Sequence, residues 1–402
     1  MKKIKKLITS ILYFLISIFV QTSKKCIIFE SGEFLYDNSF YLYKYLKQFR
    51  KLKLYYVVYS DCEKDFALKN GINTKFLIRK YNDSYSNRLK TYALYKKASL
   101  FFITFDNPFE GMNISLNKKQ KVINLRHSQF PWKNTLNYYK RLEKDYKSVN
   151  KIYFRLGTRE SFNYLAKNFK EQDWNFLFLP MPRNENMLVD KTISFSNLTS
   201  KKIKSTSKCI LFMTTFKTRD KKSYFRHNFP IRLNENDFSE INEYLQKNDM
   251  FLLIKLHHVN CLTKDDDFIK KNDHIIVLTT DDFQNNKIFV NEIFQYTDAL
   301  VTDYSSALFD YLYIDKPIGF ALGDREKYEK ESGFSVPFDK FIVGPVFTNK
   351  YEMIDFFSQI KNGVDNYKEQ RHSLHVEFNG TSYSGNYSQA IAEKFIDKKY
   401  LK

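Results

Sequence analysis

The feature that most constrains the fold is an alternation of short apolar runs with helical patterns, which begins near residue 26. The apolar runs are CIIFE (26–30), LYYVVY (54–59), KFLI (75–78), LFFIT (100–104) and KVINL (121–125), and they alternate with longer patterns such as DNSFYLYKYLKQF (37–49). Strands separated by helices pair in parallel, because the crossover helix returns the chain to the same end of the sheet. The alternation therefore predicts an α/β fold with a parallel, doubly wound sheet of the Rossmann type.

The alternation occurs twice along the chain. It restarts with CILFM (209–213), MFLLIKL (250–256), HIIVL (274–278), DALVT (298–302) and PIGFAL (317–322). The Pro-containing, Ser/Thr/Lys-rich residues 174–207 between the two halves have no sustained period and are interpreted as a linker. We expect an N-terminal α/β domain over 24–173, which binds the acceptor, and a C-terminal nucleotide-binding α/β domain over 208–375. A helical pattern in 376–402 is expected to cross back. Two such domains facing a cleft form a GT-B-like architecture, with ligands at the strand C-termini.

The first 23 residues combine a basic cluster with an apolar run over 7–20. Fourteen apolar residues fall short of the ~20 that cross a bilayer, and no small-x-small cleavage pattern follows them. The segment 1–23 is therefore predicted to associate with an anionic membrane surface, with Lys2, Lys3, Lys5 and Lys6 near the lipid. The alternative is a first helix that is buried in the domain.

The net charge favours a polyanionic partner. Lys and Arg outnumber Asp and Glu by 65 to 45, which gives a formal charge of +20 spread along the chain. The four cysteines contain no C-x-x-C pair, which argues against a disulfide framework or a zinc site and fits a reducing cytoplasm.

Polar residues follow three of the predicted strands directly. Arg126 and His127 follow one strand of the first half, His257 follows Lys255 in the second half, and DYSS (303–306) ends a third strand. Ser305 or Ser306 would cap a helix whose N–H groups and positive dipole end form an anion site, with phosphate as the natural guest. The alternative is a serine-capped helix without a ligand. Neither a Walker loop nor a G-x-G-x-x-G motif is present.

The segment TDYSSALFDYLYIDKPIGF, followed by GDREKYEKESGF and VGPVFTN, resembles the C-terminal signature of the CDP-glycerol glycerophosphotransferases, the teichoic-acid and capsule polymerases. IIFESGEFLYDNSFYLYKYL, INLRHSQFPWKN, LFMTTFKTRD and LIKLHH are similar to other segments of that family, so the resemblance covers about residues 27–348. It implies a two-domain glycosyltransferase-like fold and transfer of a polyol phosphate from a CDP-activated donor to a growing acceptor, with release of CMP.

The resemblance also implies roles for individual residues. His127 would be the base at the acceptor hydroxyl, and His257 would lie against the donor pyrophosphate. Ser305 and Ser306 would bind phosphate oxygens, and Asp303 and Asp310 would order that loop. The matching segments add the substrate-binding candidates Arg126, Lys133, Lys217, Arg219 and Lys255.

Some positions depart from the family pattern. Ser128 replaces a Gly, His258 replaces a Pro, Ser332 replaces an Arg, and Thr-Thr-Phe-Lys (214–217) replaces Pro-Thr-Phe-Arg. Lys217 or Arg219 is expected to stand in for the lost guanidinium, although Lys does not reproduce bidentate phosphate binding. The departures leave the donor, glycerol or ribitol phosphate or another polyol, and the acceptor open.

A histidine titrates near neutral pH and can take the proton of an attacking primary alcohol, while a helix tip and cations stabilise the leaving CMP. No cofactor is required by this scheme, although Asp265–Asp267 and the pair Asp281 and Asp282 offer carboxylates for Mg²⁺.

Two other functions are weighed: a CMP-sugar glycosyltransferase of the same architecture, and a noncatalytic basic protein binding nucleic acid or membranes. The latter is disfavoured because no contiguous basic-aromatic stripe occurs, and no nucleic-acid partner is expected. The predicted location is the cytoplasmic face of the bacterial cell membrane, as a peripheral protein.

Overall fold

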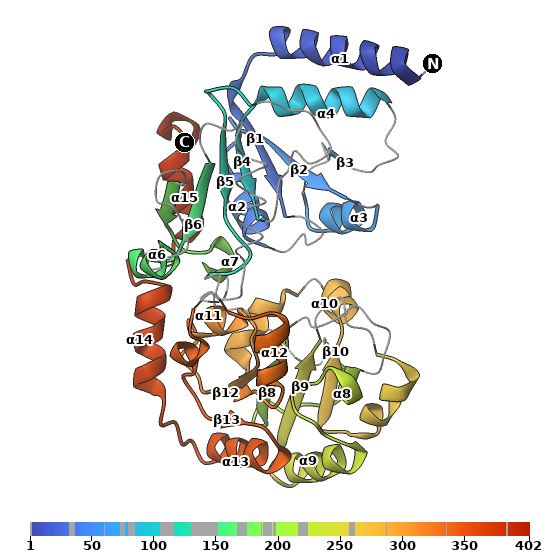
Figure 1. Ribbon diagram of the computed structural model, residues 1–402, viewed down its shortest axis with the longest axis vertical. Coiled ribbons are helices and arrows are strands. Elements are labelled where there is room, and N and C mark those ends of the chain that lie inside the picture. The colour runs from blue at the N-terminus through green and yellow to red at the C-terminus, as the bar shows by residue number, and fades with distance from the viewer. Residues whose placement is uncertain are drawn as a thin grey trace. The chain divides into compact units, whose positions relative to one another are not determined.

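The chain forms two compact units, each with a parallel sheet of its own (Figure 1). This computed structural model describes residues 2–31, 37–59, 61–72, 77–78, 85–104, 116–129, 152–166, 175–185, 187, 195, 198–215, 224–256, 262–286, 288–334, 336–382 and 385–402. The first unit comprises Met1–His127, Leu136–Glu185 and Ser382–Lys402, and the second comprises Ser128–Thr135 and Asn186–Thr381. The chain thus passes from the first unit to the second directly after His127.

The first unit has a seven-stranded sheet among its described residues, in the order β3-β2-β1-β4-β5-β6-β7. All its neighbouring strands pair in parallel. The strands are β1 (Ser23–Glu30), β2 (Lys53–Val58), β3 (Leu77–Ile78), β4 (Ala98–Ile103), β5 (Lys121–Asn124), β6 (Ile152–Leu156) and β7 (Asn175–Phe178). The strand order reverses between β1 and β4, which is the switch point of a doubly wound sheet.

Helices accompany this sheet. They are α1 (Lys2–Phe19), α2 (Asn38–Leu46), α3 (Asp61–Lys69), α4 (Tyr85–Lys97), α6 (Arg159–Ala166), α7 (Pro182–Glu185), α15 (Tyr387–Phe395) and the 3₁₀ helix η6 (Lys398–Tyr400). Although α15 comes from the far end of the chain, it packs on α2 and α7 within this unit. The N–H of Ser388 donates to Glu185 Oε2 at 3.1 Å, so the C-terminal segment is fixed by a polar contact as well as by packing.

The second unit repeats the doubly wound order with six described strands, β10-β9-β8-β11-β12-β13, again all parallel. They are β8 (Lys208–Met213), β9 (Met250–Lys255), β10 (Ile275–Leu278), β11 (Ala299–Thr302), β12 (Ile318–Ala321) and β13 (Val346–Phe347). Here the switch point lies between β8 and β11. The predicted α/β fold, with two Rossmann-like doubly wound domains, is confirmed.

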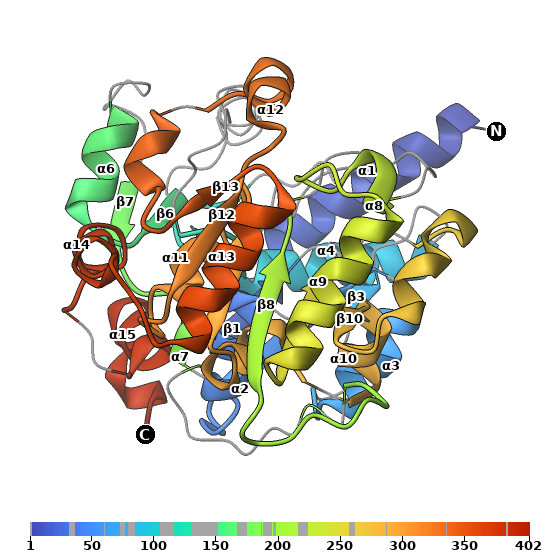
Figure 2. The ribbon, with the colours of Figure 1, turned by 90° about the horizontal axis from the view of Figure 1, so that it is seen from below.

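The helices of the second unit include α8 (Tyr224–His227), α9 (Glu235–Lys247), α10 (Thr280–Asn286), α11 (Ala307–Tyr311), α12 (Arg325–Glu331), α13 (Lys350–Lys361) and α14 (Lys368–Phe378). Three 3₁₀ helices, η3 (Lys264–Lys271), η4 (Val290–Tyr296) and η5 (Phe338–Phe341), lie among them. Helices α9 and α13 pack side by side against β9 and β13 (Figure 2). Their apolar residues join those of β8 and β9 in one buried cluster.

The central strands explain why the sequence folds this way. Every residue of β4, β9, β11 and β12 is buried, so each strand is apolar without alternation, as expected for parallel strands covered on both faces. At one edge of each sheet the strand, β3 or β13, has only two residues, which limits the unpaired edge on that side.

Two strands of the first sheet were not recognised in the sequence. Strand β6 lies after the last apolar run that was assigned to the first half. Strand β7 and helix α7 lie inside the predicted linker 174–207. Residues 175–185 are therefore part of the first unit, because NFLF pairs in register with β6 despite the prolines that follow it.

Helix α1 packs along α4 and leaves an apolar face exposed. The ring of Tyr13 stacks on Tyr92 with centroids 4.2 Å apart, and Ile16 also packs against the buried cluster of the first sheet. The exposed apolar residues of α1 are Ile11, Phe14, Leu15, Ile18 and Phe19. Among the described residues, no helix combines the length and apolar character that spanning a bilayer requires.

Candidate functional site

In the first unit, an acidic and a basic side chain meet near the carboxyl ends of β1 and β5. Asp37 is the N-cap of α2, in the segment after β1, and His127 follows β5 by three residues. The Oδ2 atom of Asp37 contacts Nδ1 of His127, although the two residues lie 90 positions apart. The Asp37 side chain is 2% exposed and that of His127 is 53% exposed, so a buried carboxylate supports a ring that solvent and ligands can reach.

A third residue, Arg183 of α7, completes the arrangement. Its Nη1 donates to Asp37 Oδ1 at 2.9 Å, and its side chain is also buried. Burial alone would raise the pKa of Asp37, but the nearby Arg183 guanidinium and His127 imidazole outweigh that effect and hold the pKa below its usual range. Asp37 is therefore a carboxylate anion held between a guanidinium and an imidazole.

The backbone around His127 is held by Asn38 and Asn124. Arg126 adopts φ 60°, a left-handed conformation that is uncommon outside glycine. Its N–H donates to Asn124 Oδ1 at 2.8 Å, and its carbonyl accepts from Asn38 Nδ2 at 2.7 Å. Asn38 Oδ1 accepts from the backbone N–H of Arg183 at 3.1 Å. The amide side chain of Asn38 therefore connects the backbone of Arg126 to that of Arg183. Arg126 is buried, with 8% of its surface exposed. Its main-chain hydrogen bonds fix the position of the next residue, His127.

A buried arginine in β6, Arg155, holds the chain segments that lead to His127 and Arg183. The side chain of Arg155 donates from Nε to the carbonyl of Leu125 at 2.7 Å and from Nη1 to the carbonyl of Leu179 at 3.1 Å. These carbonyls lie two residues before His127 and four before Arg183. The guanidinium therefore joins the ends of β5 and β7 that carry the two side chains facing Asp37.

In the second unit, Asp303 bridges the switch point between β8 and β11. It follows β11 and is fully buried, and its Oδ1 accepts from the backbone N–H of Thr215 at 2.8 Å. The hydroxyl of Thr302 donates to the carbonyl of Met213 at 3.0 Å, which adds a second connection between the two strand ends. Asp303, expected as a substrate-binding or loop-ordering residue, holds the loop after β8 in this structure.

The serine pair follows immediately at the start of α11. The hydroxyl of Ser305 accepts from the N–H of Ala307 at 3.3 Å, whereas the side chain of Ser306, at the N-cap position, makes no cap hydrogen bond. Both serines are partly buried, and Asp310 is buried within α11. The predicted strand-turn-helix is present, and its helix has five residues.

Lys255 ends β9 and is buried. Its Nζ donates to the carbonyl of Leu256 at 2.6 Å and lies 5.7 Å from the ring centre of Phe283. Burial lowers the pKa of Lys255 to about 8, with the charge of Asp282 opposing part of the shift. Four other predicted site residues, namely His257, Lys133, Lys217 and Arg219, lie outside the described residues.

The acidic clusters have structural partners. Asp266 is fully buried and accepts from the backbone N–H groups of Tyr224, Phe225 and Thr263 at 2.9–3.2 Å. Asp282 accepts from the N–H and the hydroxyl of Thr279, both at 2.7 Å. Within the described part of the chain, no group of three or more His, Cys, Asp or Glu side chains is arranged to hold a metal ion.

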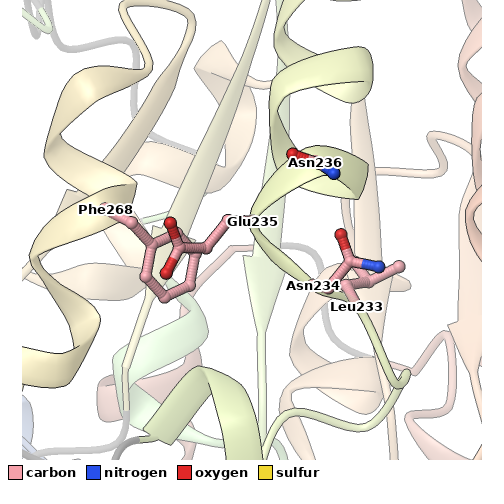
Figure 3. A pocket seen from close by; sticks show the side chains of 5 residues that line it. All are labelled: Leu233, Asn234, Glu235, Asn236 and Phe268. Atoms are coloured by element: carbon pink, nitrogen blue, oxygen red, sulfur yellow. The ribbon is translucent and has the colours of Figure 1, made fainter.

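A hollow of about 420 Å³ opens at the start of α9, lined by Leu233, Asn234, Glu235, Asn236 and Phe268 (Figure 3). Asn234 caps α9, since its Oδ1 accepts from the N–H of Asp237 at 3.0 Å. None of the predicted site residues lines this hollow. The side chains that fit a catalytic role are instead those around Asp37.

Sequence reasoning identified His127 but missed Asp37, Asn38, Arg155 and Arg183. Asp37 precedes a helical pattern and was interpreted only as part of the segment DNSFY, and Arg183 lies in the predicted linker. A contact between residues 90 positions apart leaves no local signal in the sequence. The available clue was an Asp at the start of a helix after a buried strand, at the edge where ligands of such sheets bind.

The two doubly wound sheets define a GT-B-like α/β protein. Solved structures of the wall teichoic acid polymerase TagF align with the whole chain and 96% of the TagF chain, with a TM-score of 0.69 at 19% identity. A UDP-GlcNAc 2-epimerase from Neisseria meningitidis aligns with 92% of this chain and 98% of its own, with a TM-score of 0.56 at 15% identity. Similarity at these identities concerns the fold alone.

The chain belongs to the CDP-glycerol:poly(glycerophosphate) glycerophosphotransferase family, whose family model matches residues 12–396. A teichoic acid poly(glycerol phosphate) polymerase from Staphylococcus epidermidis is 24% identical over 397 residues, which cover 92% of this chain and 50% of that protein. A teichoic acid glycerol-phosphate transferase from Staphylococcus aureus is 30% identical over 133 residues, 32% of this chain and 31% of that protein. The chain thus spans half or less of the length of these relatives.

Proposed function

We propose that the protein transfers a polyol phosphate, most readily glycerol phosphate, from a CDP-activated donor to a hydroxyl group of a lipid-linked or polymeric acceptor. CMP is released, and the product belongs to teichoic-acid or capsule synthesis. The family match over residues 12–396 supports this activity. The side-chain observation that carries it is the half-exposed His127 backed by the buried Asp37, which suits removal of a proton from an alcohol.

In the proposed reaction, a lone pair of the acceptor oxygen attacks the β-phosphorus of the donor while His127 takes the hydroxyl proton. The new P–O bond forms as the bond between that phosphorus and the oxygen of CMP breaks, so CMP leaves with the electron pair. Such transfers depend on positioning and on stabilising negative charge on the leaving group. His257, Arg126, Lys133, Lys217, Arg219 and Lys255 are proposed to supply donors or positive charge, and Ser305 and Ser306 to bind phosphate oxygens.

The test is release of CMP by the purified protein from a panel of CDP-glycerol, CDP-ribitol, a CMP-sugar and a UDP-sugar, with an oligomeric polyol-phosphate acceptor. We expect CMP release from a CDP-polyol, and loss of it in His127→Ala. The matched control is His372→Ala, because His372 is an exposed histidine on α14 far along the chain from the proposed base. CMP release from the CMP-sugar alone would support the glycosyltransferase alternative and overturn this proposal.

The protein is further proposed to act as a peripheral protein on the cytoplasmic face of the cell membrane, where an anionic lipid surface and a lipid-linked acceptor meet. Support comes from α1, whose exposed residues Phe14, Ile18 and Phe19 form an apolar face beside a helix start rich in lysine. An amphipathic helix with this composition lies in the interface of anionic bilayers.

Sedimentation with vesicles tests this surface. Wild-type protein is expected to sediment with phosphatidylglycerol vesicles, and the double variant Phe14→Asp/Phe19→Asp to stay in solution. The control is the double variant Leu68→Asp/Val376→Asp, which introduces the same two charges at exposed apolar residues of α3 and α14. Equal sedimentation of all three proteins would show that α1 does not bind the lipid.

A further inference from the structure

The carboxylate beside His127 is placed to control the chemistry of the ring. Asp37 is buried at the N-terminus of α2, with one oxygen on the N–H of Asn38 at 2.7 Å and on Arg183 at 2.9 Å, and the other on Nδ1 of His127. The carboxylate is therefore held at Oδ1 by two donors, and its Oδ2 contacts the imidazole. Of the two ring nitrogens, Nδ1 is the one that faces it.

The contacts of Nδ1 determine which ring nitrogen carries the proton. An ionised carboxylate can only accept a hydrogen bond, and a guanidinium can only donate one. Arg183 Nη1 lies 3.5 Å from Nδ1, near the upper limit for a hydrogen bond, whereas the contact of Nδ1 with Asp37 is the shorter one. Nδ1 therefore carries hydrogen and donates to Asp37, and the lone pair of the neutral ring belongs to Nε2.

The backbone keeps the ring in this orientation. Arg126 is left-handed at φ 60°, and Asn38 holds its carbonyl, so His127 leaves the strand end in a fixed direction. Arg155 holds the carbonyl of Leu125 from within the sheet. A non-glycine residue kept in a rare backbone conformation is often associated with a functional constraint.

We propose that Asp37 is a positioning residue for phosphate transfer, which fixes His127 as the Nδ1–H tautomer so that Nε2 is the nitrogen that accepts the acceptor's proton. Arg183 in turn keeps Asp37 ionised and in place. When Nε2 takes the proton, the imidazolium forms next to the Asp37 carboxylate, which stabilises the new charge. This inference rests on the proposed function, because it takes His127 as the base.

The tautomer is measured directly on the wild-type protein. Selective ¹⁵N-histidine labelling, with His127→Ala to assign the signals, distinguishes a protonated Nδ1 from a protonated Nε2 at a pH where the ring is neutral. We expect protonated Nδ1 in the wild-type protein and a loss of that preference in Asp37→Asn, whose amide can donate to the ring. A wild-type ring protonated at Nε2 would overturn the proposal without reference to any variant.

Kinetics provide the second readout. Asp37→Asn is nearly isosteric and is expected to lower kcat by about 10²–10⁴-fold, the scale seen when the aspartate of a Ser-His-Asp triad becomes asparagine. The KM for the CDP-polyol should change less than about threefold, because Asp37 does not touch the donor in this scheme. The control Asp61→Asn, at an exposed position in the first turn of α3, should leave both constants unchanged. An unchanged kcat in Asp37→Asn with a switched tautomer would overturn the positioning role.

Arg183 separates a positioning effect from general damage. Arg183→Gln removes the positive charge that faces both Asp37 and His127, so protonation of the ring becomes easier. We expect the acid limb of the kcat/KM profile to move to higher pH in this variant and to lower pH in Asp37→Asn. If kcat/KM fell by the same factor at all pH values in both variants, the loss would indicate structural damage and count against the proposal. Wild-type turnover in His127→Ala, with the tautomer as expected, would reject the proposed base while leaving the tautomer assignment intact.

Discussion

The two units each place a buried aspartate near the ends of parallel strands, but the two aspartates have different partners. Asp37 faces the ionisable side chains Arg183 and His127, and the His127 ring is half exposed. Asp303 is fully buried and accepts from the backbone N–H of Thr215. A carboxylate that contacts an exposed base can influence chemistry, whereas one that holds a neighbouring loop maintains architecture. The same residue type, placed after β1 in one unit and after β11 in the other, therefore supports two different roles.

This comparison predicts opposite consequences for truncation in the two units. In the first unit, His127→Ala should lower kcat by at least about 10³-fold, on the scale of removing a general base together with its orienting contacts. Its stability should fall by about 1 kcal/mol, because the ring is half exposed and Arg183 still pairs with the buried Asp37 carboxylate. Steady-state CMP release and urea unfolding on the same preparation measure both quantities. Full activity would exclude His127 as the base.

In the second unit, Asp303→Ala should act mainly on stability. It removes the acceptor from the buried N–H of Thr215, and leaving that donor without its bond costs about 1–3 kcal/mol. Asp303→Asn keeps an oxygen at the same place and should cost less, so the order wild type, Asn, Ala is expected in urea midpoints. An Ala variant as stable as the wild type would show that Asp303 does not hold the loop after β8, and the contrast with Asp37 would disappear.

Lys255 extends the comparison to a buried cation. Burial lowers its pKa to about 8 from the ordinary 10.5, a difference worth about 3 kcal/mol at most. Between these two pH values the unfolded chain binds a proton that the folded chain has released, so the free energy of unfolding rises with pH there. At pH 7 Lys255 is protonated in both states, so the whole cost of burying its charge lowers the free energy of unfolding. Lys255→Met should therefore have a free energy of unfolding about 1–2 kcal/mol above that of the wild type, seen as a higher urea midpoint.

The advantage of Lys255→Met should shrink as the pH rises from 8 toward 10.5 and nearly vanish above it. Urea unfolding at pH 7 and at pH 10.5 measures both ends of this range. The control is Lys247→Met, which removes a lysine from the last turn of α9, where the side chain is exposed. A Lys255→Met variant that is less stable than wild type at pH 7 would show that the hydrogen bond to Leu256 outweighs the cost of burial.

How far the sequence predicts this molecule depends on the range of the signal. Strands β1, β4, β8, β9 and β11 were predicted because each is a continuous apolar run, and that run is the direct consequence of burial on both faces. Strand β6 was missed because Arg155 interrupts its apolar run, and β7 because NFLF lies beside Pro180 in a segment otherwise rich in polar residues. Such segments are recognised as strands only through their pairing with neighbours far along the chain.

The same limit explains the site. His127 was predicted because a polar residue directly after a strand is visible in one short segment. Its partner Asp37 lies 90 positions away and Arg183 lies in a segment that resembled a linker, so their meeting depends on strand order, which no local pattern encodes. Whether His127, His257 and the serine pair meet around one diphosphate concerns both units and residues outside those described, and it stays a prediction.

The smallest effect distinguishes the two serines of the second unit. Ser305 accepts the N–H of Ala307, whereas the Ser306 side chain makes no cap hydrogen bond. Ser305→Ala should therefore cost about 0.5–1 kcal/mol of stability, the usual value of a helix-start hydrogen bond, and Ser306→Ala close to nothing. If Ser306 binds phosphate, Ser306→Ala should instead raise the KM for the CDP-polyol by about three- to tenfold. A Ser306→Ala variant with wild-type KM and stability would assign this helix start an architectural role, like that of Asp303 beside it.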